Sequence, residues 1–348
     1  MARFLFTNGV VSPPATTPPV AAFLETHPGA YTTSRTHNDA SFVLFWEKHL
    51  RRLADSVTIL YNSNPQLLFG PHCKTTPPSL PSLSSDSISL RSTIRELVNR
   101  SMKQVLPIAM EERREGEELS ITALVSGNLE KLRVGDEGFD VSIYIGSYAP
   151  AVFGIKENGA FLAVVGRGRD LAAAKYSDWV RMRKSLERLR PPKGTELLLS
   201  NDGDRILEGT VSNLFVVRRK DISEAKAKSM HCFEVQTAPL SGVLPGIIRQ
   251  VVIEVCLSKG IPLREVAPSW SEREYWAEAF ITSSLRLLQH AKTISFPSSW
   301  ESLDSNSLEN ITWIDKHFED GPGMITTIIQ KEVMERAVLE GYSVSYLV

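Results

Sequence analysis

One stretch, residues 205–217, constrains the fold of this chain more than any other. It reads Arg-Ile-Leu-Glu-Gly-Thr-Val-Ser-Asn-Leu-Phe-Val-Val and places the carboxylate of Glu208 directly before an apolar, β-branched run. Because the turn sequence Asn-Asp-Gly-Asp precedes it at 201–204, the pattern predicts a hairpin whose second strand is buried. A carboxylate at the entrance to a buried strand is costly unless a cation or a proton donor faces it. Glu208 is therefore either a simple turn residue or part of a site with such a partner.

Length and charge limit the classes of protein to consider. The chain has 348 residues, enough for two domains with separate cores. Its formal net charge of -1 and its sequence pI of about 6.7 argue against nucleic-acid and membrane surfaces, and no apolar stretch approaches the length of a bilayer span. Three widely spaced cysteines favour reduced thiols in an intracellular compartment and no metal site. We therefore expect a cytoplasmic protein without a nucleic-acid or membrane partner.

The stretch around Glu208 also matches the pattern Glu-Gly-Ser/Thr-x-Ser/Thr-Asn-x-Phe. It resembles the signature of the class IV aminotransferases, the fold type IV pyridoxal phosphate (PLP) enzymes, which include branched-chain and D-amino-acid aminotransferases and aminodeoxychorismate lyase. In that family the glutamate bonds the pyridine nitrogen of the cofactor. The resemblance implies the same role for Glu208, since a buried carboxylate keeps that nitrogen protonated and makes the ring an electron sink.

The resemblance covers nearly the whole chain and implies an α/β (α+β) fold of two domains. We expect a small N-terminal α/β domain over residues 1–149 and a larger, β-barrel-like, PLP-binding domain over 150–348. Local patterns predict a hairpin at Asn8-Gly9 and a set of further elements. These are helices over 42–59, 90–112, 245–260 and 324–339, a charged helix through Arg190, and strands over 119–125, 139–144 and 161–165. Residues 278–286 predict a further strand that ends in a hydroxyl-rich turn.

Lys175 is the candidate catalytic residue. It follows three alanines and lies 33 positions before Glu208, a separation typical of the Schiff-base lysine and the ring-nitrogen glutamate in the family. A lysine amine can form an imine with PLP and, once substrate displaces it, can carry a proton. Most lysines are surface charges, and Lys184 and Lys193, which lie among other charges, fit that description better.

Arg52 and two further segments are candidates to bind the cofactor phosphate. Residues 49–56 are similar to the family's His-x-x-Arg-Leu-x-x-Ser, in which the arginine binds phosphate through its planar fork. Residues 237–249 resemble the family's Pro-x-Leu-x-Gly-Ile/Val-Leu-Pro-Gly-Ile-Thr-Arg, so that the backbone N–H groups of Ile247 and Ile248 open a helix toward the phosphate. Ile248 replaces the usual threonine, and a hydroxyl contact is lost. Ser283 and Ser284 lie where the predicted strand ends, and the resemblance implies that they supply a second phosphate or substrate contact.

Tyr31 is the candidate on the substrate side. Residues 29–35 resemble the family's Gly-x-Phe/Tyr-Glu-Thr strand, which lines the substrate site. Thr32 stands where the family has glutamate, which puts the substrate role of this strand in question.

The resemblance implies an aminotransferase that moves an amino group between an amino acid and a 2-oxo acid, and homodimers are usual in the family. Two alternatives remain open. A PLP lyase would release pyruvate from aminodeoxychorismate, and Ser-Leu-Arg at 284–286 is nearer to that branch. A catalytically degenerate PLP-binding protein would account for Thr32, Ile248 and Gln289-His290 at altered motif positions.

Overall fold

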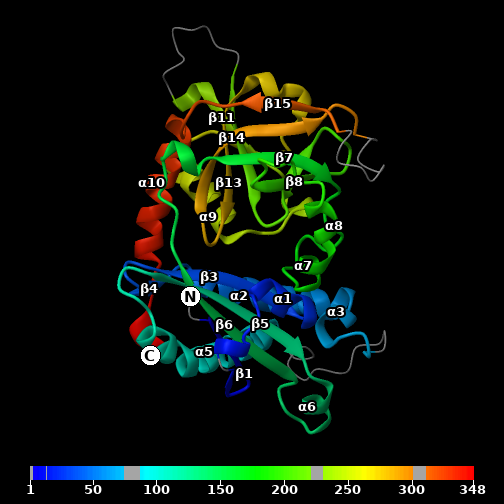
Figure 1. Ribbon diagram of the computed structural model, residues 1–348, viewed down its shortest axis with the longest axis vertical. Coiled ribbons are helices and arrows are strands. Elements are labelled where there is room, and N and C mark those ends of the chain that lie inside the picture. Colours follow the sequence, from blue (N-terminus) through cyan, green and yellow to red (C-terminus); the bar gives the residue numbers. More distant parts are fainter. Residues whose placement is uncertain (1–2, 13, 74–86, 221–229, 301–310) are drawn as a thin grey trace. The chain divides into compact units, whose positions relative to one another are not determined.

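The computed structural model describes residues 3–12, 14–73, 87–220, 230–300 and 311–348 (Figure 1). The chain divides into two compact units. The first contains Met1–Pro150 with Ala174–Met182 and Ala337–Val348, and the second contains Ala151–Ala173 and Arg183–Arg336. The boundary expected at 149–150 lies at the end of the first long segment. The chain then returns to the first unit twice, and the first of these returns carries Lys175.

The first unit is built on a seven-stranded sheet in which all neighbouring strands are antiparallel. In sheet order the strands are β16 (Tyr342–Ser343), β4 (Phe42–Val43), β3 (Ala30–His37), β5 (Glu118–Gly127), β6 (Phe139–Tyr148), β1 (Arg3–Thr7) and β2 (Val10–Ser12). Its helices are α1 (Val20–Thr26), α2 (Trp46–Ser63), α3 (Gln66–Phe69), α5 (Ser87–Glu111), α6 (Leu129–Arg133) and α7 (Asp178–Met182). The predicted first hairpin is confirmed, because Asn8 and Gly9 both take positive φ angles, 47° and 91°, between β1 and β2.

Helix α2 begins later than its periodicity predicts. Residues 42 and 43, assigned to the helix from sequence, instead form β4 and pair with β3 on one side and β16 on the other. Phe45 has a left-handed backbone, with φ at 48°, and directly precedes the helix at Trp46. From there the periodicity holds, and the helix buries one face that consists of Trp46, His49, Leu50, Leu53, Val57 and Leu60. The start predicted at residue 42 is therefore wrong, because sheet pairing outweighs the local pattern.

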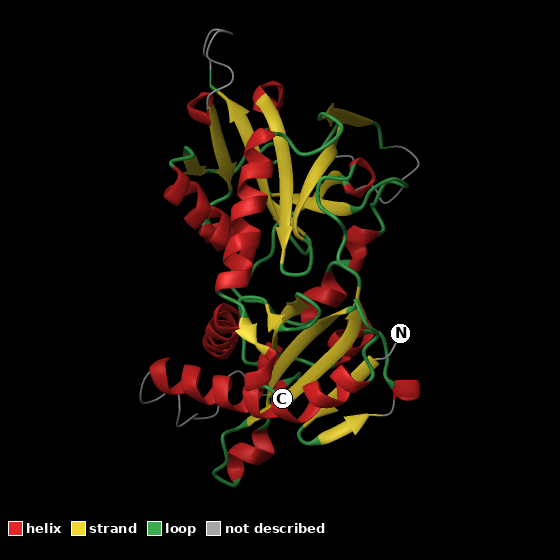
Figure 2. Ribbon diagram, turned by 90° about the vertical axis from the view of Figure 1, so that its left-hand side faces the viewer, coloured by secondary structure: helices red, strands yellow, loops and turns green. Residues whose placement is uncertain are grey.

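The second unit is built on a nine-stranded sheet that closes into a barrel. Strands β10, β13, β14, β7, β8 and β9 pair in that order, and β9 pairs back to β10. Their bounds are β7 (Ala160–Gly166), β8 (Glu196–Ser200), β9 (Ile206–Gly209), β10 (Asn213–Arg219), β13 (Trp276–Ser283) and β14 (Leu287–Pro297); β11 (Phe233–Thr237), β12 (Leu263–Glu265) and β15 (Trp313–His317) extend the sheet. The predicted β-barrel-like domain is thus confirmed, and Figure 2 shows its strands in yellow.

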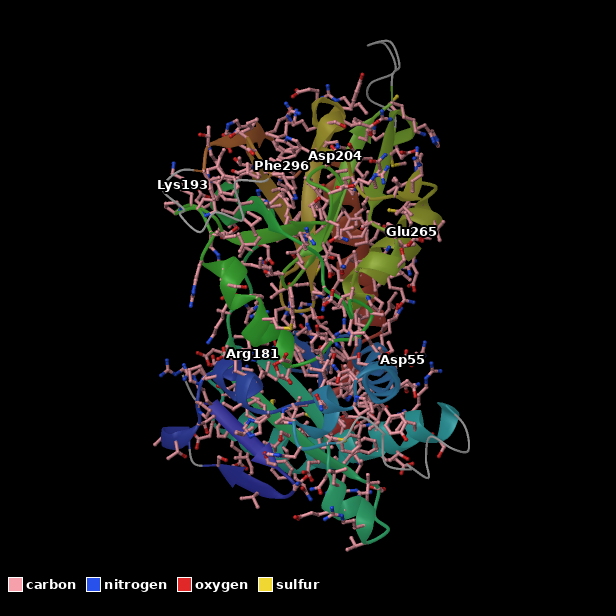
Figure 3. The ribbon with its side chains drawn as sticks, turned by 90° about the vertical axis from the view of Figure 1, so that its right-hand side faces the viewer. Asp55, Arg181, Lys193, Asp204, Glu265 and Phe296 are labelled. Atoms are coloured by element: carbon pink, nitrogen blue, oxygen red, sulfur yellow. The ribbon has the colours of Figure 1, made fainter. Side chains whose placement is uncertain are left out.

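The barrel is filled by apolar side chains from all its walls. Trp270 stacks on Phe296 with ring centroids 4.9 Å apart, and Trp276 meets Trp270 edge to face. Phe296 is labelled in Figure 3. Leucine, valine and isoleucine side chains from β7, β8, β10, β13 and β14 complete this core. A closed barrel has no exposed edges, so its rim can carry irregular turns without opening the sheet.

Helices of the second unit follow the prediction in part. Helix α9 (Ile247–Lys259) ends at Gly260, whose left-handed φ of 64° caps it, and α10 (Met324–Leu339) has the predicted bounds. The charged helix predicted through Arg190 is wrong: it is replaced by α7 and α8 (Lys184–Glu187), which belong to different units. Strand β13 stops at Ser283 and residues 284–286 form a turn, which confirms the predicted strand that ends in a hydroxyl-rich turn.

Within the described ranges, no helix combines the length and apolar character that a membrane span requires. In the same ranges, His, Cys, Asp and Glu side chains form no group able to hold a metal ion. Cys73, Cys232 and Cys256 are buried free thiols, and burial raises the pKa of the Cys256 thiol to about 12.

Candidate active site

Glu208 is the penultimate residue of β9 and is buried opposite an arginine. Only 2% of its side chain is exposed, and Arg169, at 5%, donates to its Oε1 from Nε at 3.0 Å and from Nη2 at 2.7 Å. Oε2 accepts from the Leu244 backbone N–H at 2.9 Å and from Asn213 Nδ2 at 3.3 Å. The partner that a buried carboxylate requires is therefore present in the chain itself.

Asn213 joins the elements that surround Glu208. It pairs with Glu208 across β9 and β10 and with Thr282 across β10 and β13. Its Nδ2 also donates to the Leu244 carbonyl at 3.0 Å, just before α9. A Cβ added at Gly246 would lie 2.0 Å from Asn213 Oδ1, so only glycine lets the start of α9 approach this closely.

Two buried hydroxyls beside Asn213 lack a hydrogen-bond partner among the described residues. They are Ser212 Oγ, one residue before Asn213, and Thr282 Oγ1, on the strand paired with it. Unpaired buried polar atoms are costly and uncommon in folded proteins. Two of them next to one buried carboxylate fit a place that receives a polar ligand.

The first turn of α9 presents backbone N–H groups. Hydrogen bonding within the helix begins with Gln250 N–H to the Gly246 carbonyl, so the N–H groups of Ile247 and Ile248 have no acceptor inside the helix. The turn is held by Arg249, which donates to Glu265 at 2.7 Å and to the Ala238 carbonyl at 2.8 Å (Glu265 is labelled in Figure 3). Such an end of a 13-residue helix attracts anions.

Ser283 and Ser284 lie in the turn that follows β13. Ser283 Oγ accepts from the backbone N–H and from Nε of Arg286, both at 3.3 Å. The Ser284 hydroxyl makes no hydrogen bond to any described residue. Because Ser283 follows Thr282, which pairs with Asn213, the strand register brings this turn next to the Glu208 site.

Lys175 is anchored in the first unit through its backbone. Its N–H donates to Ser56 Oγ at 3.1 Å, and its carbonyl accepts from the Tyr31 N–H at 2.9 Å. Its side chain is half-buried, and Nζ lies 4.5 Å from the centre of the Tyr31 ring. The lysine therefore has a fixed backbone and an amine over an aromatic face. Lys184 and Lys193, the less favoured lysines, are exposed, and Lys193 is labelled at the surface in Figure 3.

Arg52 lies on the same helix as Ser56 and contacts the residue that replaces the family glutamate. Its Nη2 donates to Thr32 Oγ1 at 3.0 Å, and that hydroxyl is 2.7 Å from Nδ1 of His49. The Thr32 hydroxyl therefore lies between the Arg52 guanidinium and the His49 ring and contacts both. Burial, then the charges of Arg52 and Lys175, hold the pKa of His49 well below its usual value, which keeps the ring neutral.

The predicted residues thus fall into two groups. Tyr31, Arg52 and Lys175 gather in the first unit, and Glu208, Ile247, Ile248, Ser283 and Ser284 gather around Asn213 in the second. Sequence reasoning missed Arg169, Glu196 and the side chain of Arg286. The only local signal for Arg169 is its place at the end of Gly-Arg-Gly-Arg, residues 166–169. An exposed surface loop could have the same sequence, so this signal does not single Arg169 out.

Comparisons with solved structures establish the fold. A branched-chain aminotransferase from Thermoproteus uzoniensis, solved with norvaline, shares 17% identity at a TM-score of 0.59, over 99% of this chain and 100% of that one. A fold IV-transaminase from Curtobacterium pusillum shares 15% identity at a TM-score of 0.60, over 97% and 99%. The PLP-bound form of a hypothetical aminotransferase from Mycobacterium tuberculosis shares 16% identity at a TM-score of 0.58, over 97% and 99%. No curated protein matches the chain.

A comparison with models of protein families identifies the family of this chain. The model for amino-transferase class IV matches residues 29–294, which is most of the chain and includes every residue assigned above from Tyr31 to Ser284. The chain is therefore a PLP-dependent aminotransferase of fold type IV, and it belongs to the class IV aminotransferase family.

Proposed function

We propose that this aminotransferase moves an amino group from an amino acid to a 2-oxo acid, with Lys175 as its catalytic residue. The observation that carries the proposal is the setting of Lys175, whose backbone is fixed by Ser56 and Tyr31 while its amine lies over the Tyr31 ring. A lysine fixed in this way can move its amine without disturbing the surrounding chain. Its Nζ would hold the cofactor at rest and then carry a proton. Tyr31 is proposed to line the substrate side.

The donors of the second unit suit PLP, which carries a ring N–H and an anionic phosphate. Glu208 would accept the ring N–H at Oε2, where the hydrogen bond from Asn213 Nδ2 is long, at 3.3 Å. Arg169 opposes neutralisation of this carboxylate, because a guanidinium favours its charged form. When bound, PLP supplies an electron sink for negative charge at the substrate α-carbon.

The phosphate would be held by charge and by hydrogen-bond donors. We assign this role to Arg52, to the backbone N–H groups of Ile247 and Ile248, and to the hydroxyls of Ser283 and Ser284. Arg52 also donates a hydrogen bond to the hydroxyl of Thr32, the residue that stands where the family has glutamate. Because that hydroxyl contacts both Arg52 and His49, the replacement keeps the two side chains connected, which supports a functional site.

A spectrum tests the cofactor and its lysine. The purified protein is mixed with PLP, and the absorbance is recorded before and after sodium borohydride. We expect a visible band that borohydride removes in the parent and in Lys184→Ala, whose lysine is exposed. Lys175→Ala is expected to lack the band. A band that persists unchanged in Lys175→Ala, or no band in the parent, would refute the assignment.

The donor is found by adding single amino acids to the PLP-loaded protein. An aminotransferase converts PLP to its pyridoxamine form with the donor alone, whereas release of pyruvate without an acceptor would indicate a lyase. The name of the Thermoproteus neighbour makes branched-chain amino acids the first donors to test.

We further propose a cytoplasmic homodimer, on the resemblance to the family, and sedimentation equilibrium tests its mass.

A further inference from the structure

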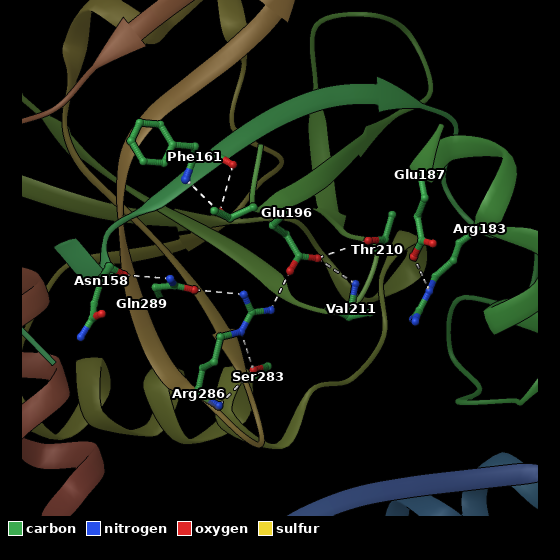
Figure 4. Close-up of polar contacts among 11 residues, drawn as sticks. Asn158, Phe161, Arg183, Glu187, Glu196, Thr210, Val211, Ser283, Arg286 and Gln289 are labelled. Carbon is green, nitrogen blue, oxygen red and sulfur yellow. Dashed lines mark hydrogen bonds and ion pairs between the residues drawn. The ribbon is translucent and has the colours of Figure 1, made fainter. Parts of the chain in front are cut away.

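Glu196 is a buried carboxylate that no sequence pattern singled out. It begins β8, has 3% of its side chain exposed, and lies in the wall of the barrel (Figure 4). Its Oε1 accepts from the Val211 backbone N–H at 3.1 Å and from Thr210 Oγ1 at 3.3 Å. Its Oε2 accepts from Arg286 Nη2 at 2.6 Å. One carboxylate therefore connects the turn after Glu208 to the turn after β13.

Arg286 uses each nitrogen of its guanidinium in a different direction. Nη2 binds Glu196, Nη1 donates to Gln289 Oε1 at 3.0 Å, and Nε donates to Ser283 Oγ at 3.3 Å. Gln289 is fixed in turn, since its Nε2 donates to the Asn158 carbonyl at 2.8 Å (Figure 4). Only a planar, branched cation can make these three contacts together.

These contacts decide what Ser283 can do. A hydroxyl has two acceptor lone pairs and one donor hydrogen, and Arg286 occupies both lone pairs through its backbone N–H and Nε. Ser283 can then act toward a ligand only as a donor. The neighbouring Ser284 hydroxyl has no partner among the described residues. The turn is thereby prepared for an anion rather than for a cation or a hydrogen-bond donor.

The ion pair also governs charge near this turn. Glu196 alone would be a buried negative charge two hydrogen bonds away from the Ser283 hydroxyl, and it would repel an anionic ligand. Paired with Arg286, it contributes no net charge. Loss of Arg286 would therefore both release Ser283 and expose the ligand to the field of Glu196.

We propose that Arg286, held by Glu196, is a positioning residue that sets the affinity of this enzyme for the cofactor phosphate. The inference rests on the proposed function, in which Ser283 and Ser284 bind that phosphate. Thr210 and Val211 follow Glu208 in the chain, and Ser283 follows Thr282, the strand partner of Asn213. The Glu196–Arg286 pair thus fixes the two segments that flank the row formed by Glu208, Asn213 and Thr282.

The test compares PLP with pyridoxal, which has the same ring without the phosphate. Apoprotein affinity for each is measured by equilibrium dialysis. In Arg286→Gln we expect PLP affinity to fall about tenfold or more, as for loss of one oriented, charge-assisted contact, while pyridoxal affinity changes by less than about twofold. The double variant E196Q/R286Q should regain part of the PLP affinity, because it removes the uncompensated charge.

A matched control is available in the same unit. Arg336 pairs with Glu254 at 3.1 Å and has 26% of its side chain exposed, against 25% for Arg286. Arg336→Gln is expected to bind both PLP and pyridoxal like the parent. Equal losses for PLP and pyridoxal in Arg286→Gln, or no loss for PLP, would overturn the proposal. Failure of the parent itself to bind PLP would instead refute the proposed function, and this inference with it.

A second variant keeps the test decisive if Arg286→Gln unfolds. Arg286→Lys retains the positive charge opposite Glu196 but has no fork to reach Ser283 and Gln289. We expect its thermal unfolding midpoint to stay near that of the parent, with a selective loss of PLP affinity. Parental PLP affinity in Arg286→Lys would show that the three-way contact is not needed.

Discussion

At the scale of single residues, Arg169 and Glu208 form a buried ion pair in the second unit. Removing one member of a buried pair leaves a charge without compensation, which typically costs about 3–5 kcal/mol. We expect Arg169→Met to lower the free energy of unfolding of the apoprotein by that amount. The measurement is urea denaturation followed by tryptophan fluorescence, since Trp270 and Trp276 lie in the core of the same unit.

The control for Arg169 is an arginine that is itself mostly exposed and whose ion pair is long. Arg264 lies 3.6 Å from Glu234 and is mostly in solvent, so Arg264→Met should change the free energy of unfolding by less than about 1 kcal/mol. Similar losses in the two variants would contradict the view that burial makes the Arg169–Glu208 pair important for stability.

His49 gives a pH-dependent prediction. Burial and the charges of Arg52 and Lys175 lower its pKa in the folded state. In the unfolded chain the pKa of His49 is about 6.5. As pH falls below this value, unfolded His49 binds a proton that folded His49 does not, and this protonation stabilises the unfolded state. We expect the free energy of unfolding to fall between pH 6.5 and about pH 5, and to fall less in His49→Asn.

Two other histidines, His37 and His290, also have lowered pKa values because of burial, and they leave a residual slope in every variant. His231→Asn, at an exposed position, is the control and should keep the parental slope. If His49→Asn shows the same slope as the parent, the neutral state assigned to this imidazole is wrong.

At the scale of elements, the start of α9 depends on close approach between a loop and a strand. A methyl group at Gly246 would force Asn213 away from both Glu208 and Leu244. We expect Gly246→Ala to cost about 1–3 kcal/mol by overpacking and to weaken PLP binding by about tenfold. Gly242→Ala is the matched control, because its nearest contact would be 3.6 Å, to a leucine side chain. If Gly246→Ala binds PLP as tightly as the parent, Asn213 does not contribute to PLP binding.

Elements whose determinants are local could be predicted from the sequence. Helix α10 has its predicted bounds because its apolar positions repeat over four turns, and α9 ends at Gly260 because glycine readily takes the left-handed conformation. The start of α2 could not be predicted, because residues 42 and 43 are drawn into the sheet by β3 and by β16, which is 300 positions away in the chain.

The residues of the candidate site likewise fall into those that local sequence patterns predict and those that they do not. Glu208, Lys175 and Arg52 could be proposed from the sequence because each sits in a short pattern of fixed spacing. Arg169 and Arg286 could not, since their carboxylate partners lie 39 and 90 positions away and nothing near them in sequence distinguishes them from solvated arginines. Ion pairs between distant segments are a property of the folded barrel, so sequence patterns predict candidate ligand contacts but not the arginines that pair with buried carboxylates.

At the scale of the whole molecule, the first unit is completed by the last residues of the chain. Strand β16 pairs with β4, and β4 pairs with β3, the strand that carries Tyr31 and Thr32. In the same final segment, Leu347 is 0% exposed, whereas Leu339, eight positions earlier, is 83% exposed. The chain end therefore packs as part of the unit that contains Lys175.

Two leucine substitutions test this role of the chain end. Leu347→Ala should destabilise the first unit by about 2–5 kcal/mol, the usual cost of a cavity at a buried leucine, while Leu339→Ala should change stability by less than about 0.5 kcal/mol. Hydrogen exchange measured by mass spectrometry should show lost protection in β3 and β4 of Leu347→Ala and parental protection in β7 and β8, because the second unit keeps its own barrel core. Uniform loss of protection in both units would show instead that the two units unfold together. Unchanged protection in β3 would show that this strand, which carries Tyr31, does not depend on the chain end.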